Sequence, residues 1–289
     1  MRKRQIVGFL VLLTLAVALA TFAQEREVEP VAFHKISDKL YEVTGGSGAR
    51  GGVYIGETGV LLIDSKMDET SVSDVLDGVR NLTDKPILYL VNTHSDGDHV
   101  QGNRYIPTSV IIVAHENCRE EFFHTRWDGS PSDWTDPALA DFVPEITFSD
   151  RMTLHLGADQ VEIHHFGVGH TTGDAVIYFP EEKAAFVGDQ IFFDRPQLIH
   201  AYKGGDPFGH VKNLKLMLKT LDAEQFFSGH GDVTDRDGIR AHADAMTDRI
   251  VHVQTLTEKG AALEEIRQGF PEDEHELVEI IHKAVTERM

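Results

Sequence analysis

One segment constrains this chain more than any other: an apolar strand pattern that ends in a loop rich in imidazoles and carboxylates. Residues 87–94 read ILYLVNTH, which is typical of a buried strand, and residues 94–99 read HSDGDH. Four side chains that can bind a metal, those of His94, Asp96, Asp98 and His99, fall within these six positions. Because side chains alternate along an extended segment, His94, Asp96 and Asp98 should face one way and His99 another. Such a loop could contact two metal ions; a surface loop that holds these residues by chance is the alternative for this segment taken alone.

Three other places put a single imidazole or carboxylate beside glycine at the end of a β-rich run. They are GVGHTTGD around His170, AFVGDQIF around Asp189 and FFSGHGD around His230. Glycine permits sharp turns and a close approach of the backbone to a ligand. Loops at strand ends are also where rigid scaffolds carry functional groups. We therefore predict that His170, Asp189 and His230 join the HSDGDH loop in one metal centre.

The order of β-rich and helical runs predicts the fold class. The first half should form strands LYEV, GVYIG, VLLID, ILYLVNTH and SVIIVA, with helices over about 70–82 and 115–124. A polar, irregular segment over 126–144, with Trp127 and Trp134, reads as a long loop. The runs ITF, MTLHL, VEIHHF, AVIYF and KAAFVG should build a second sheet, followed by helices over about 207–221 and from 235 onward. This order predicts an α/β (α+β) fold, a four-layer αββα sandwich.

The N-terminal residues read as an export signal. A basic start, an uncharged run over 6–20 and small residues suited to cleavage follow one another: Arg2, Lys3, Arg4, then Ala18, Ala20 and Ala23. We expect a signal peptide over 1–23, cleaved after Ala23 or after Ala20, and one domain over 24–289. Retention of the segment as an N-terminal anchor is the alternative.

Composition excludes several kinds of partner and site. The chain carries 27 basic and 47 acidic residues, and removal of the three basic residues of the signal leaves 24 − 47 = −23 formal charges. Such a surface repels phosphate backbones, so no nucleic acid partner is expected. Cys118 is the only cysteine, which excludes a disulfide framework and a thiolate-rich zinc site. We assign Cys118 no role.

The order HSDGDH, GHTTGD, GD and GHG resembles the metallo-β-lactamase superfamily. Its pattern is H-x-H-x-D-H, then a lone His, a carboxylate or Cys, and a last His, and the resemblance spans roughly residues 31–289. It implies that His94, Asp96 and His170 bind a first metal, that Asp98, His99 and His230 bind a second, and that Asp189 bridges both. It also implies a bridging hydroxide as nucleophile, which Asp98 orients as the catalytic residue.

Asp96 departs from the family pattern, because it stands where the family has its second His. A carboxylate changes the summed charge of the ligands from −2 to −3, which favours harder ions. We therefore expect two divalent ions, zinc first, with iron or manganese as alternatives; some flavodiiron relatives carry a carboxylate here. A second alternative is that Asp96 does not bind metal and that only the second site fills. The Cys and Lys of the most familiar β-lactamases are also replaced, by Asp189 and Phe192.

These features predict an exported, two-metal hydrolase that acts on a small ester, lactone, thioester or amide. Its expected partner is a small-molecule substrate, with no membrane partner after signal cleavage, and the oligomeric state stays open. Three alternatives remain: a β-lactamase, a diiron redox protein, and a metal-binding protein without turnover.

Several residues receive minor expectations. Trp127 and Trp134 could cover the metals or simply pack against the scaffold, and Phe192, Phe193 and Tyr202 could line the substrate pocket. Thr171 and Asp174 are expected to support His170, and His164 and His165 to be structural. The run GGSGARGG over 45–52 reads as a flexible hairpin, not a phosphate-binding loop, because it lacks the Lys-Ser/Thr ending.

Overall fold

The computed structural model describes residues 28–126 and 128–289, so the predicted signal peptide and Trp127 lie outside the described residues. Within the compact unit Val31–Met289, the first sheet has seven strands in sequence order. They are β1 (Ala32–Lys35), β2 (Leu40–Thr44), β3 (Gly51–Ile55), β4 (Val60–Ile63), β5 (Ile87–Val91), β6 (Ile111–His115) and β7 (Ile146–Phe148). Strands β1 to β4 pair antiparallel, and β4 to β7 pair parallel.

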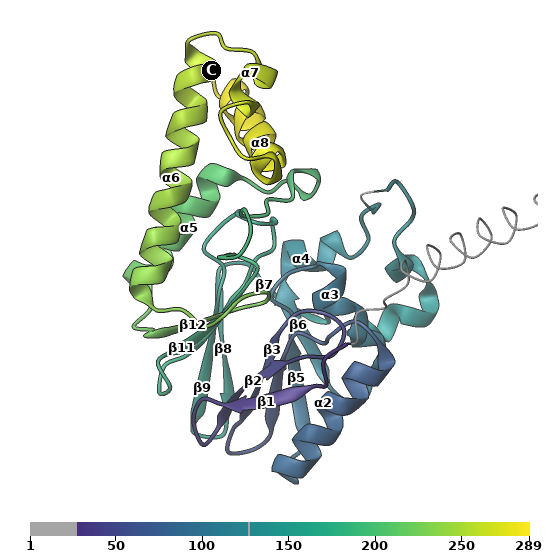
Figure 1. The fold of residues 1–289 in the computed structure, drawn as a ribbon. Helices are drawn as coiled ribbons and strands as arrows, with labels where there is room; N and C mark the ends of the chain where they lie inside the picture. The colour runs from purple at the N-terminus through teal and green to yellow at the C-terminus, as the bar shows by residue number, and fades with distance from the viewer. Residues whose placement is uncertain (1–27, 127) are drawn as a thin grey trace, which may run out of the picture. The chain divides into compact units, whose positions relative to one another are not determined.

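The second sheet has five strands in the order β12-β11-β10-β9-β8. Their bounds are β8 (Arg151–Leu156), β9 (Asp159–His164), β10 (Val176–Phe179), β11 (Ala184–Gly188) and β12 (Gln225–Ser228). Only the β11/β12 pair is parallel. The two sheets share one apolar core, in which Tyr54 and Leu61 of the first sheet meet Phe179 and Phe186 of the second. Figure 1 shows the two sheets against each other.

Helices cover the outer face of each sheet. Helix α2 (Glu69–Leu82) packs Val72, Val75 and Val79 on the first sheet, and α5 (Pro207–Thr220) and α6 (Arg236–Glu258) pack on the second. Both faces of the central strands are therefore buried, which explains why strand β4 reads as the continuous apolar run VLLI. Each of these helices begins at an aspartate whose side chain accepts hydrogen bonds from the first turn: Asp68, Asp206 and Asp235.

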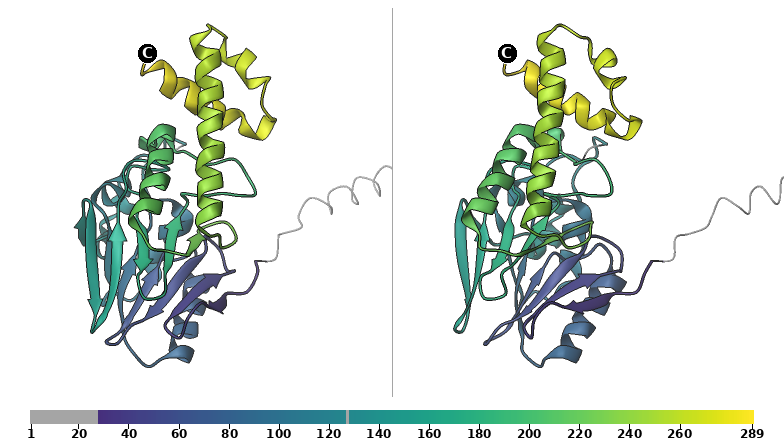
Figure 2. Two further views of the ribbon diagram at one scale, coloured as in Figure 1. Left: turned by 90° about the vertical axis from the view of Figure 1, so that its left-hand side faces the viewer. Right: turned by 60° about the vertical axis from the view of Figure 1, so that its left-hand side comes forward.

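The last helices form an apolar cluster of their own. Helix α7 (Leu263–Arg267) and α8 (His275–Thr286) pack on α6 and α5, and Figure 2 shows α6 running past the sheets to meet α8. The buried Ile199, from the long connection between β11 and α5, belongs to the same cluster. None of the helices in the described part of the chain has the length and apolar character needed to cross a bilayer.

The predicted mixed α/β fold with two packed sheets is confirmed, with four local corrections. The run ITF is β7 and belongs to the first sheet, so the chain changes sheets at residues 149–150, later than predicted. Strand β1 was not predicted. The helix expected over 115–124 is shorter, α4 (Glu116–Glu121), and the His115 ring caps its start by accepting from the Asn117 N–H. The helix expected from 235 onward is interrupted at Gly260 and Pro271.

The hairpin prediction for residues 45–52 is correct, since these residues join the antiparallel strands β2 and β3. Its expected flexibility is not what the contacts indicate. The loop backbone is tied to both halves of the fold, because Ala49 N donates to Asp98 O and Arg50 N donates to Gly229 O, over 3.0 and 2.8 Å. The loop thereby holds the HSDGDH segment against the end of β12.

Candidate metal centre

The HSDGDH segment follows the carboxyl end of the buried strand β5, as predicted, but it is not extended throughout. Helix α3 (Gly97–Val100) begins directly after Asp96, and His99 N donates to Asp96 O over 2.9 Å. The alternation expected for an extended segment therefore fails from Gly97 onward. A helical turn separates Asp98 and His99 from His94 and Asp96 instead, and it directs the two pairs to different parts of the centre.

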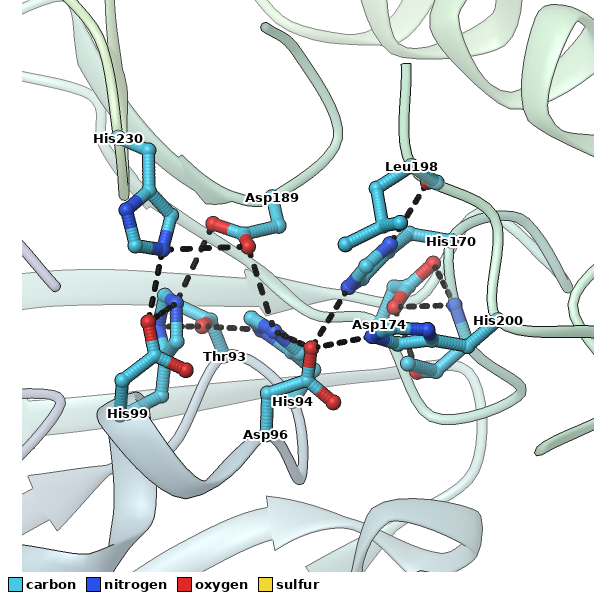
Figure 3. A network of polar contacts seen from close by, with 12 residues as sticks. Thr93, His94, Asp96, His99, His170, Asp174, Asp189, Leu198, His200 and His230 are labelled. Atoms are coloured by element: carbon cyan, nitrogen blue, oxygen red, sulfur yellow. Dashed lines mark hydrogen bonds and ion pairs between the residues drawn. The ribbon is translucent and has the colours of Figure 1, made fainter. Parts of the chain in front are cut away.

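The other three predicted residues come from the second sheet. Asp189 directly follows β11 and His230 lies two residues beyond β12, and these parallel strands end at the same edge of the sheet. His170 lies in the loop between β9 and β10. Figure 3 shows that their side chains converge on His94, Asp96 and His99. All seven predicted ligands are thus brought together from four distant parts of the chain.

The seven side chains form two groups. His94, Asp96, His170 and Asp189 offer ligand atoms that all lie within 4.8 Å of one another, and so do Asp98, His99 and His230. In the first group, Asp96 Oδ2 lies 3.4 Å from His94 Nε2 and 3.2 Å from His170 Nε2. Ligands about 2.0–2.1 Å from a tetrahedral metal are separated by about 3.3 Å. The spacing of these three atoms therefore fits a metal ion.

Asp189 lies between the two groups. Its Oδ1 is 3.2 Å from His99 Nε2, and its Oδ2 is 3.4 Å from His230 Nε2 and 3.9 Å from His94 Nε2. The second group is closed by Asp98, whose Oδ2 lies 2.8 Å from His230 Nε2. One carboxylate thus contacts imidazoles of both groups, which is the arrangement expected of a bridging ligand.

Three buried atoms at the centre form no well-aligned hydrogen bond with the described residues, although two of them lie 3.2 Å apart. They are His94 Nε2, His99 Nε2 and Asp189 Oδ1. Buried polar atoms are nearly always satisfied, and leaving one unpaired costs about 1–3 kcal/mol. All three point into the centre and are donor atoms suited to a transition metal. The chemistry of the centre therefore fits bound metal ions.

Two glycines allow the strands to approach this closely. A Cβ at Gly229 would lie 2.4 Å from Asp189 Oδ1 and 2.6 Å from His99 Cε1, and one at Gly188, whose φ is +55°, would lie 2.7 Å from Thr93 Oγ1. No side chain fits either position without displacing a candidate ligand or its support. The glycines beside Asp189 and His230 thus have the role that the sequence predicted.

The ring nitrogens that face away from the centre are held by the protein. His99 Nδ1 lies 2.7 Å from Asp64 Oδ2, and His170 Nδ1 donates to Leu198 O over 2.8 Å. Asp64 also accepts hydrogen bonds from Thr93 N and Thr93 Oγ1. Its φ of +55° is a strained backbone conformation for a residue other than glycine. Partners of this kind fix the ring orientation of metal-binding histidines. No local pattern in the sequence identifies Asp64 or Leu198.

The support expected for His170 from Thr171 and Asp174 is not formed. Asp174 Oδ1 accepts instead from Thr171 N and Thr171 Oγ1, over 3.0 and 2.6 Å. These bonds fix the backbone of the loop and do not reach the His170 ring. The His170 ring is instead supported by the carbonyl of Leu198, 28 residues away in the chain.

The sequence also missed two residues that contact Asp96. Lys203 Nζ lies 2.5 Å from Asp96 Oδ1, and His200 Nε2 lies 2.7 Å from Asp96 Oδ2. Both come from the connection between β11 and α5, more than 100 residues along the chain from Asp96. No spacing rule links positions so far apart, so no local pattern could have identified them.

The charges of the centre perturb one another strongly. Burial opposes ionisation of Asp189, but the imidazoles of His99 and His94 hold the pKa of its carboxyl below the ordinary value. Burial likewise disfavours a charged His170, but the hydrogen bond to Asp96 and its negative charge raise the pKa of the imidazole to about 9. The carboxylates thus create a negative potential that attracts cations. Protons and metal ions would compete for the imidazoles.

The centre opens into a cleft of about 520 Å³, to which Asp96, Asp98, Asp189 and His230 contribute. Tyr202, which is 53% exposed, and Arg195 line this cleft. Figure 3 shows Asp96 and Asp189 among the histidines that come from loops of both sheets. The cleft is thus large enough for a small molecule and brings it beside the candidate ligands.

The aromatic residues after Asp189 differ in position. Phe192 is buried and stacks on His230, with ring centroids 5.7 Å apart, and Phe193 faces His242 instead of the cleft. Of the three aromatic residues expected in the pocket, only Tyr202 lines it. Trp134 is buried and packs against Phe122, and both residues also line the cleft.

The expected structural roles agree with the contacts. His164 is buried in β9 and lies 2.8 Å from Glu162, and His165 stacks on His115 with ring centroids 3.8 Å apart. Cys118 is a buried free cysteine of α4, and burial raises the pKa of its thiol.

Comparisons with known proteins agree with this geometry. The family model described as the metallo-beta-lactamase superfamily matches residues 51–230. A metallo-beta-lactamase type 2 from Elizabethkingia meningoseptica is 24% identical over 248 residues, which cover 77% of this chain and 88% of that protein. The 2,4-dinitroanisole O-demethylase subunit alpha from Nocardioides sp. (strain JS1661) is 26% identical over 139 residues, 47% of this chain and 39% of that protein.

Among solved structures, a metallo-beta-lactamase from Pontibacter korlensis has the same fold, with a TM-score of 0.63 and 18% identity, and the match covers 75% of this chain and 99% of that one. The chain belongs to the metallo-beta-lactamase superfamily. This confirms the resemblance, the fold class and the class of metal-dependent hydrolase that the sequence predicted.

Proposed function

We propose that the chain is an exported hydrolase that uses two divalent metal ions to cleave a small ester, lactone, thioester or amide. One observation carries the proposal: the carboxylate of Asp189 lies between two groups of ligand atoms, three of which are buried without a well-aligned hydrogen bond to the described residues. Metal ions would satisfy these atoms and neutralise the clustered carboxylates.

In this proposal His94, Asp96 and His170 hold the first ion, Asp98, His99 and His230 hold the second, and Asp189 contacts both. When bound, such ions lower the pKa of water and polarise a carbonyl group. The protein fixes the ligands through Asp64, Thr93 and Leu198, whose contacts orient the imidazoles before substrate arrives.

Asp98 is the catalytic residue of the proposal. Its side chain is 31% exposed and lines the cleft, whereas that of Asp189 is only 3% exposed. A carboxylate at the cleft surface can accept a hydrogen bond from the attacking water and hold the proton that this water loses. Its contact with His230 fixes one oxygen and leaves the other available for that task.

One cation of the cleft, Arg195, could receive a negative group of the substrate. Arg195 lines the cleft, and no carboxylate of the described residues lies within 4.0 Å of this guanidinium. The Arg195 guanidinium lies over the Phe192 ring, 4.1 Å from its centroid, which fixes the cation beside the centre. This observation, together with the similarity to proteins named metallo-beta-lactamase, supports β-lactam hydrolysis as a second candidate activity.

Zinc is the proposed first choice of metal, with iron or manganese as alternatives. Four imidazoles and three carboxylates without sulfur form a borderline-to-hard ligand set. The same proposal includes a signal peptide over residues 1–23, which rests on the N-terminal sequence pattern. It also includes a small-molecule substrate and no nucleic acid partner, which rests on the acidic composition. Mass spectrometry of the protein recovered from an exporting host would locate the first residue of the mature chain.

Metal analysis and a substrate screen test the function together. Protein purified without added metal should bind two equivalents of metal per chain, and lactones, thioesters, esters and lactams should be assayed with zinc, manganese and iron in turn. The variant Asp98→Asn should lose about 100-fold or more in kcat. Binding of a single zinc ion per chain, or an Asp98→Asn protein as active as its parent, would refute the proposal.

A further inference from the structure

Asp96, the residue that departs from the family pattern, is surrounded by cationic and imidazole side chains. Its Oδ2 faces His94 and His170 of the first group over 3.4 and 3.2 Å, and also His200 Nε2 over 2.7 Å. Its Oδ1 faces Lys203 Nζ over 2.5 Å. Both oxygens of the Asp96 carboxylate are thus fully engaged.

His200 and Lys203 approach Asp96 from outside the first group. The four residues of that group, which include Asp96, do not include His200. Figure 3 shows His200 on the side of Asp96 that faces away from Asp189. Because Lys203 engages Oδ1, Oδ2 is the oxygen directed at His94 and His170.

Lys203 also compensates the negative charge that Asp96 adds. An aspartate in place of a histidine brings one negative charge into a centre that already holds Asp98 and Asp189. The Lys203 side chain is only 10% exposed, so its positive charge acts on Asp96 with little screening by water. The Asp96–Lys203 pair is together neutral, as the imidazole of the family pattern is.

The segment that carries these two residues is held on both sides. Lys203 ends the short 3₁₀ helix η4 (Ala201–Lys203), and its Nζ also donates to Ser95 Oγ over 2.8 Å. His200 N donates to His170 O over 2.8 Å, and the neighbouring Ile199 is buried among side chains of α6 and α8. The family model ends at His230, so the helices that bury Ile199 lie outside it.

We propose that Lys203 and His200 are positioning residues that enable Asp96 to act as a ligand of the first metal through Oδ2. Lys203 balances the added charge and occupies Oδ1, and His200 fixes the orientation of the carboxylate. The C-terminal helices anchor the segment that presents both. This inference rests on the proposed function, because it takes Asp96 as a ligand of the first ion.

Metal affinity measured on the purified full-length chain tests the inference without an activity assay. Metal-free parent and variant proteins are titrated with zinc and with cobalt(II) against a chromophoric chelator, and ligation is followed by cobalt absorbance. Lys203→Met should weaken binding of one of the two ions by about 10- to 100-fold and leave the other unchanged. Lys203→Arg, which keeps the charge, should stay within a few fold of the parent, as should the exposed control Lys212→Met.

Repeating the Lys203→Met substitution in an Asp96→His protein separates its effect on metal binding from a general loss of protein stability. In an Asp96→His protein the ammonium of Lys203 would face a neutral imidazole, so adding Lys203→Met should strengthen binding of the first ion there. The effect of Lys203→Met would thus have opposite signs in the two backgrounds. His200→Gln supplies a second variant of the same contact, and circular dichroism of each metal-free protein verifies folding.

The outcomes separate the two proposals. If the parent binds two ions and Lys203→Met and His200→Gln bind both with unchanged affinity, the positioning roles are wrong and the proposed function stands. If Lys203→Met lowered metal affinity equally in the parent and in the Asp96→His protein, the positioning role of Lys203 would also be wrong. If the parent binds fewer than two ions, the two-metal function fails, and the positioning inference fails with it.

Discussion

Replacing Gly229 by alanine should disable the metal centre, because this glycine packs directly against two candidate ligands. The new Cβ would lie 2.4 Å from Asp189 Oδ1 and 2.6 Å from His99 Cε1, whereas ordinary contacts begin at 3.4 Å. The Asp189 carboxylate must therefore move by about 3.4 − 2.4 = 1.0 Å, or the backbone must shift by a similar amount. A displacement of about 1 Å at a catalytic group can cost about 100-fold in rate, and overpacking costs about 1–3 kcal/mol of stability.

The matched control is Gly231→Ala, two residues further along the chain. A Cβ there would have Ser228 Oγ, at 3.7 Å, as its nearest neighbour, which is an ordinary contact. Metal content, unfolding temperature and kcat/KM should be measured for both variants and the parent. We expect Gly229→Ala to lose at least one equivalent of metal and about 100-fold in kcat/KM, and Gly231→Ala to match the parent. A Gly229→Ala protein with full metal content and activity within twofold of the parent would refute the geometry of the centre.

Three further predictions concern metal removal, the outer contacts and acid stability. Chelation should lower the unfolding temperature, since the freed carboxylates repel one another; an unchanged unfolding curve would contradict bound metal. Asp64→Asn, which tolerates the left-handed backbone, should weaken metal binding about 10- to 100-fold through His99, as isothermal titration would show. Burial lowers the pKa of His115 from 6.5 to about 4, so only the unfolded chain gains this proton as the pH falls through that interval. The free energy of unfolding should therefore fall by up to about 3 kcal/mol as the pH falls from 6.5 to 4. In urea titrations at several pH values, His115→Asn should make this dependence on pH less steep; a variant with the parent's pH dependence would contradict the prediction.

The candidate ligands could be found from the sequence because their signals are local. A strand that ends in HSDGDH, and three strand ends where glycine adjoins His or Asp, identify all seven residues without knowledge of the fold. Alternating apolar runs likewise predict most strands and the two-sheet architecture. Errors arise where neighbouring sequence is ambiguous, as in the short run ITF, which fits either sheet and pairs with β6 in the structure.

The contacts around the ligands could not be predicted in this way. The support of His170 by Leu198 and of His99 by Asp64 joins residues 28 and 35 positions apart, and only the folded backbone brings them together. The same holds for Lys203 and Asp96, 107 positions apart. The helical turn at Gly97–Val100 also follows from tertiary contacts, because Ser65 N donates to the His99 carbonyl and Ala49 N to the Asp98 carbonyl.

By itself, then, the sequence determines which side chains can hold metal, that the chain belongs among mixed α/β folds, and that Asp96 adds a negative charge. Each of these is a property of residue types and their local spacing. Tertiary structure alone decides that Asp189 lies between the two groups of ligands and that a buried Lys203 faces Asp96. The physical reason is that packing of two sheets and the C-terminal helices brings together charges from distant segments, and the energy of a charge depends on its nearest buried neighbours.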